Sequence, residues 1–392
     1  MTGSLRTMAV VILTAAMFGL TYGLSAPLIA LELSDAGYSE ALIGVNGAMY
    51  AVGVLMIAPF LPALLKRFGF GRLAKGALLA AGGLFALFPA SPFFWIWFPL
   101  RAALGAASET MFVVSEAWLN QITAEANRGK TIAIYVTALS AGTALGPAIL
   151  TLVGRDQSLA FVIGAALAFV GFLVLQSGRP AEVQSAEESK TSLIAFLKVV
   201  PLAIAAAALN AALEAAGLTL LPLYAIQLGW QEQSATLLLT ILLLGSITLQ
   251  LPIGWIGDRV KRQLLIVVLG AMSAVGALVW PFALSHDWLA YPLLFAWGGA
   301  FVGIYTTMIA ILGDRFRGGE LVSVYALLSI AWGLGALVGP LIGGLAMEFS
   351  PHGLPGVAAI SCAIFTIFAA LRKSGAKSVG NDVDKACGPE PG

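Results

Sequence analysis

The feature that most constrains this chain is a succession of long apolar stretches. About 20 apolar residues in an α-helix cross the roughly 30 Å of hydrocarbon in a membrane. Such stretches lie at about 8–31, 41–65, 75–91, 94–118, 131–154, 158–177, 196–228, 233–256, 263–284, 288–312, 320–347 and 354–371. They are too long for the ten-residue alternating strands of a membrane barrel. The sequence therefore predicts an all-α membrane protein with twelve transmembrane helices.

The composition agrees with a protein that lives in a membrane. Of the 392 residues, 59% are hydrophobic and only 10% are charged, whereas a soluble domain has about 25% charged residues. The net charge of +1 gives no basic field for nucleic acid. The two cysteines, Cys362 and Cys387, form no disulfide framework. We expect the lipid bilayer as the surroundings and no nucleic acid as a partner.

The positions of lysine and arginine predict the orientation. All but two of the 21 basic residues fall on one side of the predicted spans. The exceptions are Arg101, which lies within a span, and Arg155, which lies on the opposite side. Because basic residues collect in cytoplasmic loops, we expect both termini to be cytoplasmic, in a multi-pass protein of the inner (plasma) membrane.

The chain divides into two halves of six predicted helices. We expect an N-terminal bundle over 1–178, a polar cytoplasmic linker over 179–195, a C-terminal bundle over 196–371 and a disordered tail over 372–392. A weak repeat relates the halves: Gly142, Gly146 and Pro147 recur 193 residues later as Gly335, Gly339 and Pro340. Parallel repeats of this kind are typical of transporters built around a central path.

The stretch from Arg101 to Gln121 places charges inside a predicted span. At 100° per residue, one arc about 120° wide contains Arg101, Gly105, Ser108, Glu109, Phe112 and Glu116. The other side carries small apolar residues, which let helices pack closely in lipid. A charge at the bilayer centre costs about 2.5 to 3.5 kcal/mol, so it persists mainly where it faces protein or a watery cavity.

Three motifs make the chain resemble the major facilitator superfamily of secondary transporters over nearly its whole length. Gly254-Trp-Ile-Gly-Asp258-Arg259 resembles the family's cytoplasmic loop motif, in which glycine allows tight packing and the charges form a clamp; Lys66 and Arg67 hold the corresponding place in the first half. Arg101-Ala-Ala-Leu-Gly105 resembles the fourth-helix pattern, whose arginine is tied to proton coupling in many members. The two glycine-proline segments resemble the antiporter signature.

Short stretches around Glu116 and Glu214 resemble the YcaD-like branch of that superfamily. They read Ser115-Glu116-Ala-Trp118-Leu119 and Leu213-Glu214-Ala-Ala-Gly217. The resemblance implies two six-helix bundles and a bacterial inner-membrane transporter of a small molecule.

Each buried charge has a functional and a structural interpretation. Arg101, Glu109 and Glu214 are candidates for proton coupling, since burial favours a neutral carboxyl group that exchanges a proton. Alternatively, Arg101 ties helices together through backbone carbonyls, Glu109 pairs with Arg101, and Glu214 makes an interhelical hydrogen bond. A pair between Arg101 and Glu109 is strained, because eight residues span about 12 Å of helix. For Glu116 we favour clamping of Arg128 over contact with cargo.

Other residues are candidates for lining a substrate cavity. Asn210 lies one turn from Glu214 and on the same helix face. The remaining candidates are polar or aromatic side chains within the apolar spans: Asn46, Ser108, Phe112, Glu116, Trp297, Tyr305, Tyr325 and Trp332. Aromatic residues in an apolar protein also serve plain packing. The glycine-proline segments likewise fit either a pliable contact between rocking bundles or simple close packing.

The sequence contains no cluster of metal ligands, nucleotide-binding loop or nucleophile constellation, so we expect neither enzyme activity nor a cofactor or metal. The leading hypothesis is a monomeric secondary transporter that exports a small organic solute in exchange for protons. Proton-coupled uptake comes second, and a protein of this fold that senses or assembles without transporting is a third alternative. A channel is disfavoured, because most spans have no polar stripe.

Overall fold

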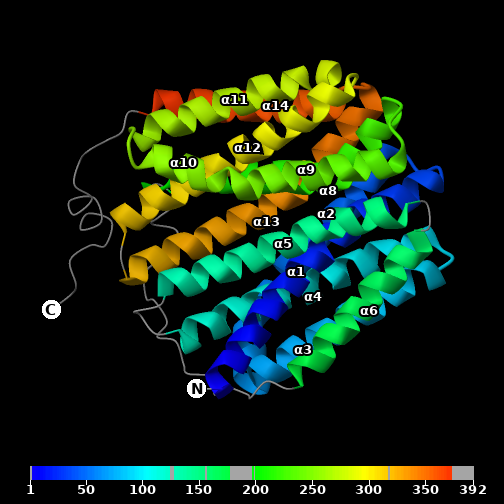
Figure 1. Cartoon of the computed structure of the whole chain (residues 1–392), viewed down its shortest axis with the longest axis vertical. Coiled ribbons are helices and arrows are strands. Elements are labelled where there is room, and N and C mark those ends of the chain that lie inside the picture. Colours follow the sequence, from blue (N-terminus) through cyan, green and yellow to red (C-terminus); the bar gives the residue numbers. More distant parts are fainter. Residues whose placement is uncertain are drawn as a thin grey trace.

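A computed structural model describes residues 2–123, 128–154, 157–176, 197, 199–316 and 318–372. Within these ranges the chain forms helices and the turns that join them, without a β-strand. Figure 1 shows the helices running side by side, with α1 beginning and α14 ending on the left side of the view. The predicted linker over 179–195, and the tail beyond Arg372, lie outside the described residues.

The first half contains six long helices and two short 3-10 segments. They are α1 (Thr2–Asp35), α2 (Glu40–Ile57), η1 (Ala58–Phe60), α3 (Leu61–Ala90), η2 (Phe94–Ile96), α4 (Trp97–Ile122), α5 (Arg128–Val153) and α6 (Gln157–Leu175). The second half contains α8 (Pro201–Gln227), α9 (Glu232–Thr248), α10 (Gln250–Gly257), α11 (Arg262–Ala283), α12 (Asp287–Arg315), α13 (Gly318–Phe349) and α14 (Gly353–Leu371).

Most of the long helices are long and apolar enough to span a membrane. Within the described part, ten helical stretches are long and apolar enough to cross a membrane. One of them runs continuously over 40–90, where two spans are predicted, and turns at Gly69, whose φ of 73° suits glycine. The helix α4 carries Arg101 and is not among the ten. The structure is thus an all-helical membrane architecture.

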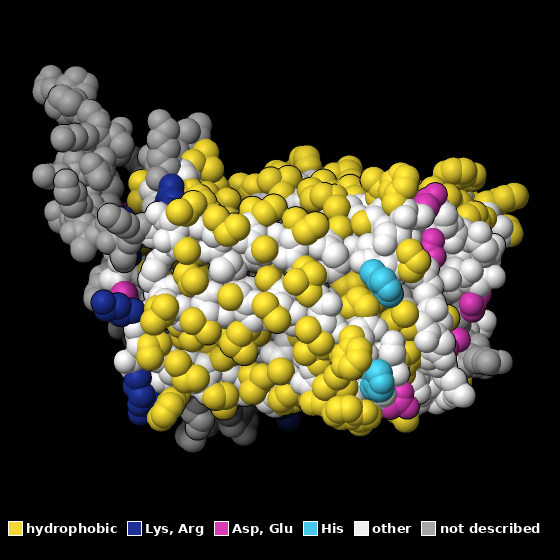
Figure 2. All heavy atoms as spheres, turned by 90° about the horizontal axis from the view of Figure 1, so that it is seen from above, with side chains coloured by type: hydrophobic (Ala, Val, Ile, Leu, Met, Phe, Trp, Pro, Cys, Tyr) yellow, Lys and Arg dark blue, Asp and Glu magenta, His cyan; other side chains and the backbone are white. Residues whose placement is uncertain are grey.

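The surface carries its charges at the two ends of the helices. Figure 2 shows lysine and arginine side chains gathered at one end of the visible face, with an acidic side chain beside them, and further acidic side chains and both histidines toward the other end. The wide band between them is apolar or neutral on this face. This distribution fits a bilayer around the middle of the molecule, because a charge costs least at the membrane boundary.

Glycines bring helix backbones together at equivalent places in the two halves. A side-chain carbon added at Gly105 of α4 would overlap the carbonyl of Tyr50 in α2, and one added at Gly53 would overlap the carbonyl of Ala102. In the second half, Gly298 and Gly245 approach the carbonyls of Leu242 and Phe295 in the same way. The corresponding residues are 192 or 193 positions apart, so the weak sequence repeat extends to the backbone contacts.

The glycine-proline segments make similar contacts within each half. Gly142 and Gly146 of α5 pack directly against the backbone of α1, at Ala16 and Gly23. In α13, Gly335 and Gly339 pack against the carbonyls of Ala208 and Ala212 in α8. These glycines are therefore positions where helix backbones approach closely, which is compatible with either of the two interpretations given above.

Several helix pairs join the halves, among them α2 with α13, α5 with α9 and α1 with α8. The helices α2 and α13 meet where Gly44 faces the carbonyl of Pro340 and Gly344 faces the carbonyl of Glu40. The helices α5 and α9 meet where the hydroxyls of Thr151 and Thr236 lie 3.1 Å apart. Both contacts lie toward the end at which α1 stops and α2 starts, so the halves are closed against each other at that end.

We predict that Gly105→Ala destabilises the protein, because the added methyl group would collide with a backbone carbonyl that cannot rotate away. Overpacking of this kind costs about 1–3 kcal/mol. The matched control is Gly83→Ala in α3, where an added carbon meets no atom within 4 Å. The measurement is the midpoint of thermal unfolding in detergent. Equal midpoints for the two variants would contradict the close approach of α2 and α4.

Candidate functional site

The buried guanidinium of Arg101 lies against the first of a chain of aromatic rings where the two halves meet. We call Tyr22, Tyr50, Arg101 and Trp332 the central cluster. The guanidinium carbon of Arg101 lies 5.1 Å from the ring centroid of Tyr50, and that ring lies 5.1 Å from the ring of Tyr22. Trp332 of α13 closes the group from the second half, with its ring centroid 6.3 Å from that of Tyr22. Arg101 itself is only 2% exposed.

The backbone places Arg101 and Tyr50 beside each other. The helices α2 and α4 touch through Gly53 and Gly105, without side chains between them. This close approach sets the face of α4 that carries Arg101 against the tyrosine of α2. A cation over an aromatic ring is attracted by the electrons of the ring, and the attraction strengthens away from water. The ring therefore offsets part of the cost of burying the charge.

Several buried polar atoms around the central cluster have no hydrogen-bond partner among the described residues. A buried polar group without a partner costs about 1–3 kcal/mol. The hydroxyls of Tyr50 and Ser108, which are neighbours, are both among these atoms. The side chains with unpartnered atoms here are Tyr22, Asn46, Tyr50, Arg101, Ser108 and Asn210. Such a concentration of unused donors and acceptors is suited to a polar ligand.

The carboxylates stand apart from the cation. In the described part of the chain Arg101 forms no ion pair, so the alternative in which Glu109 pairs with Arg101 is not seen in this structure. Glu109 on α4 and Glu214 on α8 are half-buried, and Glu116 is exposed. The hydroxyl of Tyr22 lies within electrostatic range of both Arg101 and Glu214. A cation of the first half and a carboxylate of the second thus lie near the same phenol.

A second row of residues lies farther along α4, past the central cluster. The ring of Phe112 packs on Phe18 of α1, with 5.0 Å between their centroids. Ser115 and Tyr135 of α5 share a hydrogen bond of 3.0 Å. Tyr305 of α12 is half-buried and within electrostatic range of Glu116 and Glu214. The predicted partner of Glu116, the side chain of Arg128, lies outside the described residues.

Two predicted cavity residues lie away from the central cluster. The indole of Trp297 is 3% exposed, donates a 2.9 Å hydrogen bond to the carbonyl of Ser273 and meets the ring of Trp280 edge to face. Its contacts belong to the packing between α11 and α12, so the structure does not bring it to the central cluster. Tyr325 on α13 is 37% exposed, and no contact in the described part joins it to that cluster.

In the loop motif from Gly254 to Arg259, the charged residues have other partners than the resemblance to the family implies. Asp258 pairs at 3.3 Å with Arg262, which also pairs with Asp314 at the end of α12. Arg259 instead stacks 3.6 Å above the ring of Trp255. A carbon added at Gly254 would meet nothing within 4 Å, so that glycine does not serve tight packing here.

The corresponding basic pair of the first half has no carboxylate partner in the described residues. Lys66 and Arg67 lie in α3, and Arg67 stacks over the ring of Phe68 at 5.3 Å. The clamp that the structure shows is therefore confined to the second half, where Arg262 binds two aspartates.

Sequence reasoning missed Tyr22, Tyr50, Arg262 and Asp314. The signal for Tyr50 was present, since it lies one turn after Asn46 and three residues before Gly53 on a span with few other polar groups. The pairing of Arg262 with Asp314 gave no such signal, because 52 residues separate them.

Comparison with known proteins decides the family. The model of the Major Facilitator Superfamily matches residues 11–305 and 205–385. The chain belongs to the Major Facilitator Superfamily.

Relatives and solved structures agree with this assignment. The chain is 26% identical over 361 residues to the MFS-type transporter YfkF of Bacillus subtilis, covering 86% of this chain and 88% of that protein. It is 26% identical over 388 residues to the MFS-type transporter YcaD of Shigella flexneri serotype 5b, covering 95% and 97%. The predicted resemblance to the superfamily and to YcaD is confirmed.

Two crystal structures share the fold. A nucleoside transporter, NupG, superposes with a TM-score of 0.77 at 12% identity, covering 94% of this chain and 98% of that one. A D-xylose-proton symporter superposes with a TM-score of 0.74 at 15% identity, covering 95% and 98%. The protein is accordingly a multi-pass membrane transporter and not an enzyme.

We predict that Tyr50→Phe leaves the thermal stability unchanged or slightly raised, because the hydroxyl that it removes has no partner. The matched control is Tyr224→Phe in α8, whose hydroxyl shares a 3.0 Å hydrogen bond with Nδ1 of His352. Loss of that bond is expected to cost about 1 kcal/mol. Thermal unfolding of both variants gives the comparison. If Tyr50→Phe lost as much stability as Tyr224→Phe, the hydroxyl would serve the fold rather than a ligand.

Proposed function

We propose that this transporter moves a small organic solute across the inner membrane by alternating access and that it exports the solute in exchange for protons. The observation that carries the proposal is the central cluster, where an unpaired buried arginine and unpartnered polar atoms lie between two halves built on one repeat. In transporters of repeated halves, the substrate lies near the midplane and the halves rock around it. Arg101, Glu109 and Glu214 are the proposed coupling residues.

The proposed topology has twelve spans and cytoplasmic termini. The continuous stretch over 40–90 counts as two spans separated by the turn at Gly69, and α4 counts as a further span. Basic residues at the end where α1 starts support a cytoplasmic location for that end. We further propose that the protein acts as a monomer, with the cargo path between its own two halves.

The carboxylates suit a proton-coupled cycle. Burial disfavours the charged carboxylate, so each group crosses between compartments most easily in its protonated form. Moving one charge through 100 mV is worth about 2.3 kcal/mol, which sustains roughly a fifty-fold solute gradient per proton. Glu109 and Glu214 come from different halves, and relative motion of the halves would change the surroundings of both.

We predict that Glu109→Gln and Glu214→Gln each abolish concentrative transport, because neither variant can release a proton. A thermal-shift screen against metabolites and drugs first identifies a cargo, and proteoliposomes with a pH-sensitive dye then report proton movement. The direction of proton flow relative to cargo separates export from uptake. Glu348→Gln, at the exposed end of α13, is the control and should transport normally.

Two results would count against this proposal. Concentrative transport by both carboxylate variants would show that these groups do not couple protons. A screen in which no compound stabilises the protein, together with no proton movement, would favour the alternative of a sensor or assembly partner without transport.

We also predict that a disulfide between Thr151→Cys and Thr236→Cys stops transport. The two hydroxyls lie 3.1 Å apart across the halves, so cysteine sulfurs at these positions are within reach of each other. The variants are made with Cys362→Ala and Cys387→Ser, and each single cysteine variant serves as a control. Oxidation should block the cycle, and a reducing agent should restore it. Equal rates in the oxidised and reduced double variant would contradict alternating access at this contact.

A further inference from the structure

A pocket of about 430 Å³ opens at the charged end of the second half, away from the central cluster. It lies between the start of α8, the start of α11, the last turns of α12 and the end of α14. Its apolar wall is formed mainly by Val200, Leu202, Met308, Ile311 and Leu312. Arg315, Arg372 and Gln263 supply the polar part.

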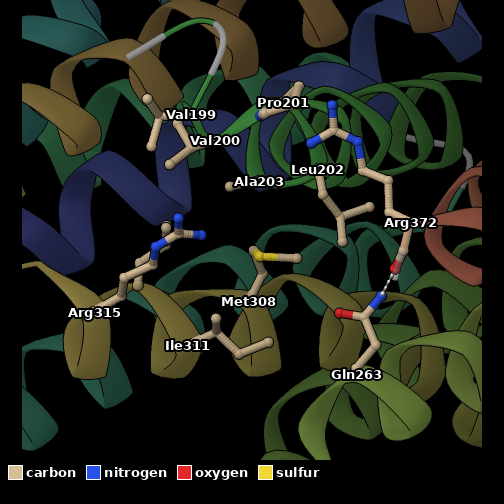
Figure 3. Close-up of a pocket in the computed structure, with 11 residues that line it drawn as sticks. Val199, Val200, Pro201, Leu202, Ala203, Gln263, Met308, Ile311, Arg315 and Arg372 are labelled. Carbon is tan, nitrogen blue, oxygen red and sulfur yellow. Dashed lines mark hydrogen bonds between the residues drawn. The ribbon is translucent and has the colours of Figure 1, made fainter. Parts of the chain in front are cut away.

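The two arginines approach the pocket from opposite sides. Figure 3 shows Arg315 and Arg372 on either side of the opening, with Met308 and Ile311 between them. The chain around Arg372 is fixed by Gln263, whose amide nitrogen donates to the carbonyls of Ala369 and Arg372 at 2.7 and 3.2 Å. The amide oxygen of Gln263 remains on the pocket side.

Neither arginine is neutralised within the described residues. Arg315 stacks over the ring of Phe316 at 5.5 Å, and Arg372 stacks over the ring of Phe368 at 5.2 Å. Neither forms an ion pair there, whereas the neighbouring Arg262 binds both Asp258 and Asp314. No described acidic residue lines the pocket. Asp258 and Asp314, the described acidic residues that pair at this end, are both bound by Arg262, so neither neutralises the arginines of the pocket.

The start of α8 adds to this charge. The helix begins at Pro201 and runs for 27 residues, and its N-cap residue Val200 makes no side-chain capping bond. Helix N-termini carry a partial positive charge and favour anions. A simpler interpretation treats each arginine as a cation at the negative end of its own helix. That interpretation explains each arginine separately. It does not explain why both arginines face one pocket beside the start of α8.

We propose that this pocket binds a phosphate-bearing anion. Guanidinium groups match phosphate oxygens in pairs, which gives both strength and geometry. The apolar wall below the arginines would accept a chain attached to the phosphate, as in the headgroup of an anionic lipid. Basic pockets between transmembrane helices are suited to such headgroups. A free phosphate compound offers the same charge without the chain.

Thermal-shift titrations of the purified full-length protein in neutral detergent test the proposal and separate the two sources. The probes are a short-chain phosphatidylglycerol, a short-chain phosphatidylcholine and inorganic phosphate, all at one ionic strength set with sodium chloride. Stabilisation by phosphatidylglycerol alone identifies a lipid headgroup, and stabilisation by inorganic phosphate as well identifies a phosphate site that needs no chain. Stabilisation by neither anion, or equally by phosphatidylcholine, would overturn the proposal.

Substitutions of the two arginines test whether the thermal stabilisation comes from binding in this pocket. Arg315→Gln and Arg372→Gln should each raise the half-saturating concentration about tenfold, because each removes a charged hydrogen bond to phosphate. Together they should remove the shift. The control is Arg259→Gln, which removes an arginine at the same end that stacks on Trp255 outside the pocket. An equal loss in this control would show a general charge effect and no site. The single variants decide the question even if the double variant does not fold.

Discussion

The close approach of helix backbones is the constraint on which the rest of this structure depends. Lipid tails are as apolar as leucine, so helices in a membrane gain little from hiding apolar side chains and associate through packing and hydrogen bonds. Here glycines replace side chains at several of the places where two helices touch, as Gly53 and Gly105 do between α2 and α4. That contact sets Tyr50 against Arg101, and the ring then stabilises a buried cation. Without the glycines the helices would separate and the arginine would lose its partner.

The repeat supplies a symmetric scaffold on which the chemistry is asymmetric. The backbone contacts of Gly53 and Gly105 recur at Gly245 and Gly298. The same offset carries Arg101 to Leu294, which is fully buried and apolar. The first half therefore holds the cation. The second half has no arginine at the equivalent place and carries a half-buried carboxylate on a different helix, Glu214 of α8. Two similar backbone scaffolds thus carry different side chains.

The buried polar atoms of the central cluster lower the stability of the fold, and a core of apolar residues would avoid this loss. Unpartnered polar atoms on Tyr22, Asn46 and Tyr50 lie in the same region as the buried arginine, although apolar residues of similar size would pack there without penalty. Residues that weaken a fold are retained where they act on something else. The unpartnered atoms of the central cluster differ in this respect from Trp297, whose indole is satisfied within its own half.

The sequence by itself determined the helical membrane architecture, the repeat, the superfamily and the polar face of α4. These follow from the length of apolar stretches, the 3.6-residue period and short motifs, all of which are local properties of the chain.

Only the tertiary structure decided which faces meet. It brought Tyr22, Tyr50 and Trp332 around Arg101, moved Trp297 into the packing of α11 and α12, and gave Asp258 the partner Arg262 in place of Arg259. The physical reason is that periodicity tells which residues share a helix face, but the neighbour of that face depends on backbone contacts between helices far apart in the chain. In a protein this apolar, an aromatic residue that packs and one that borders a ligand have the same local surroundings in sequence.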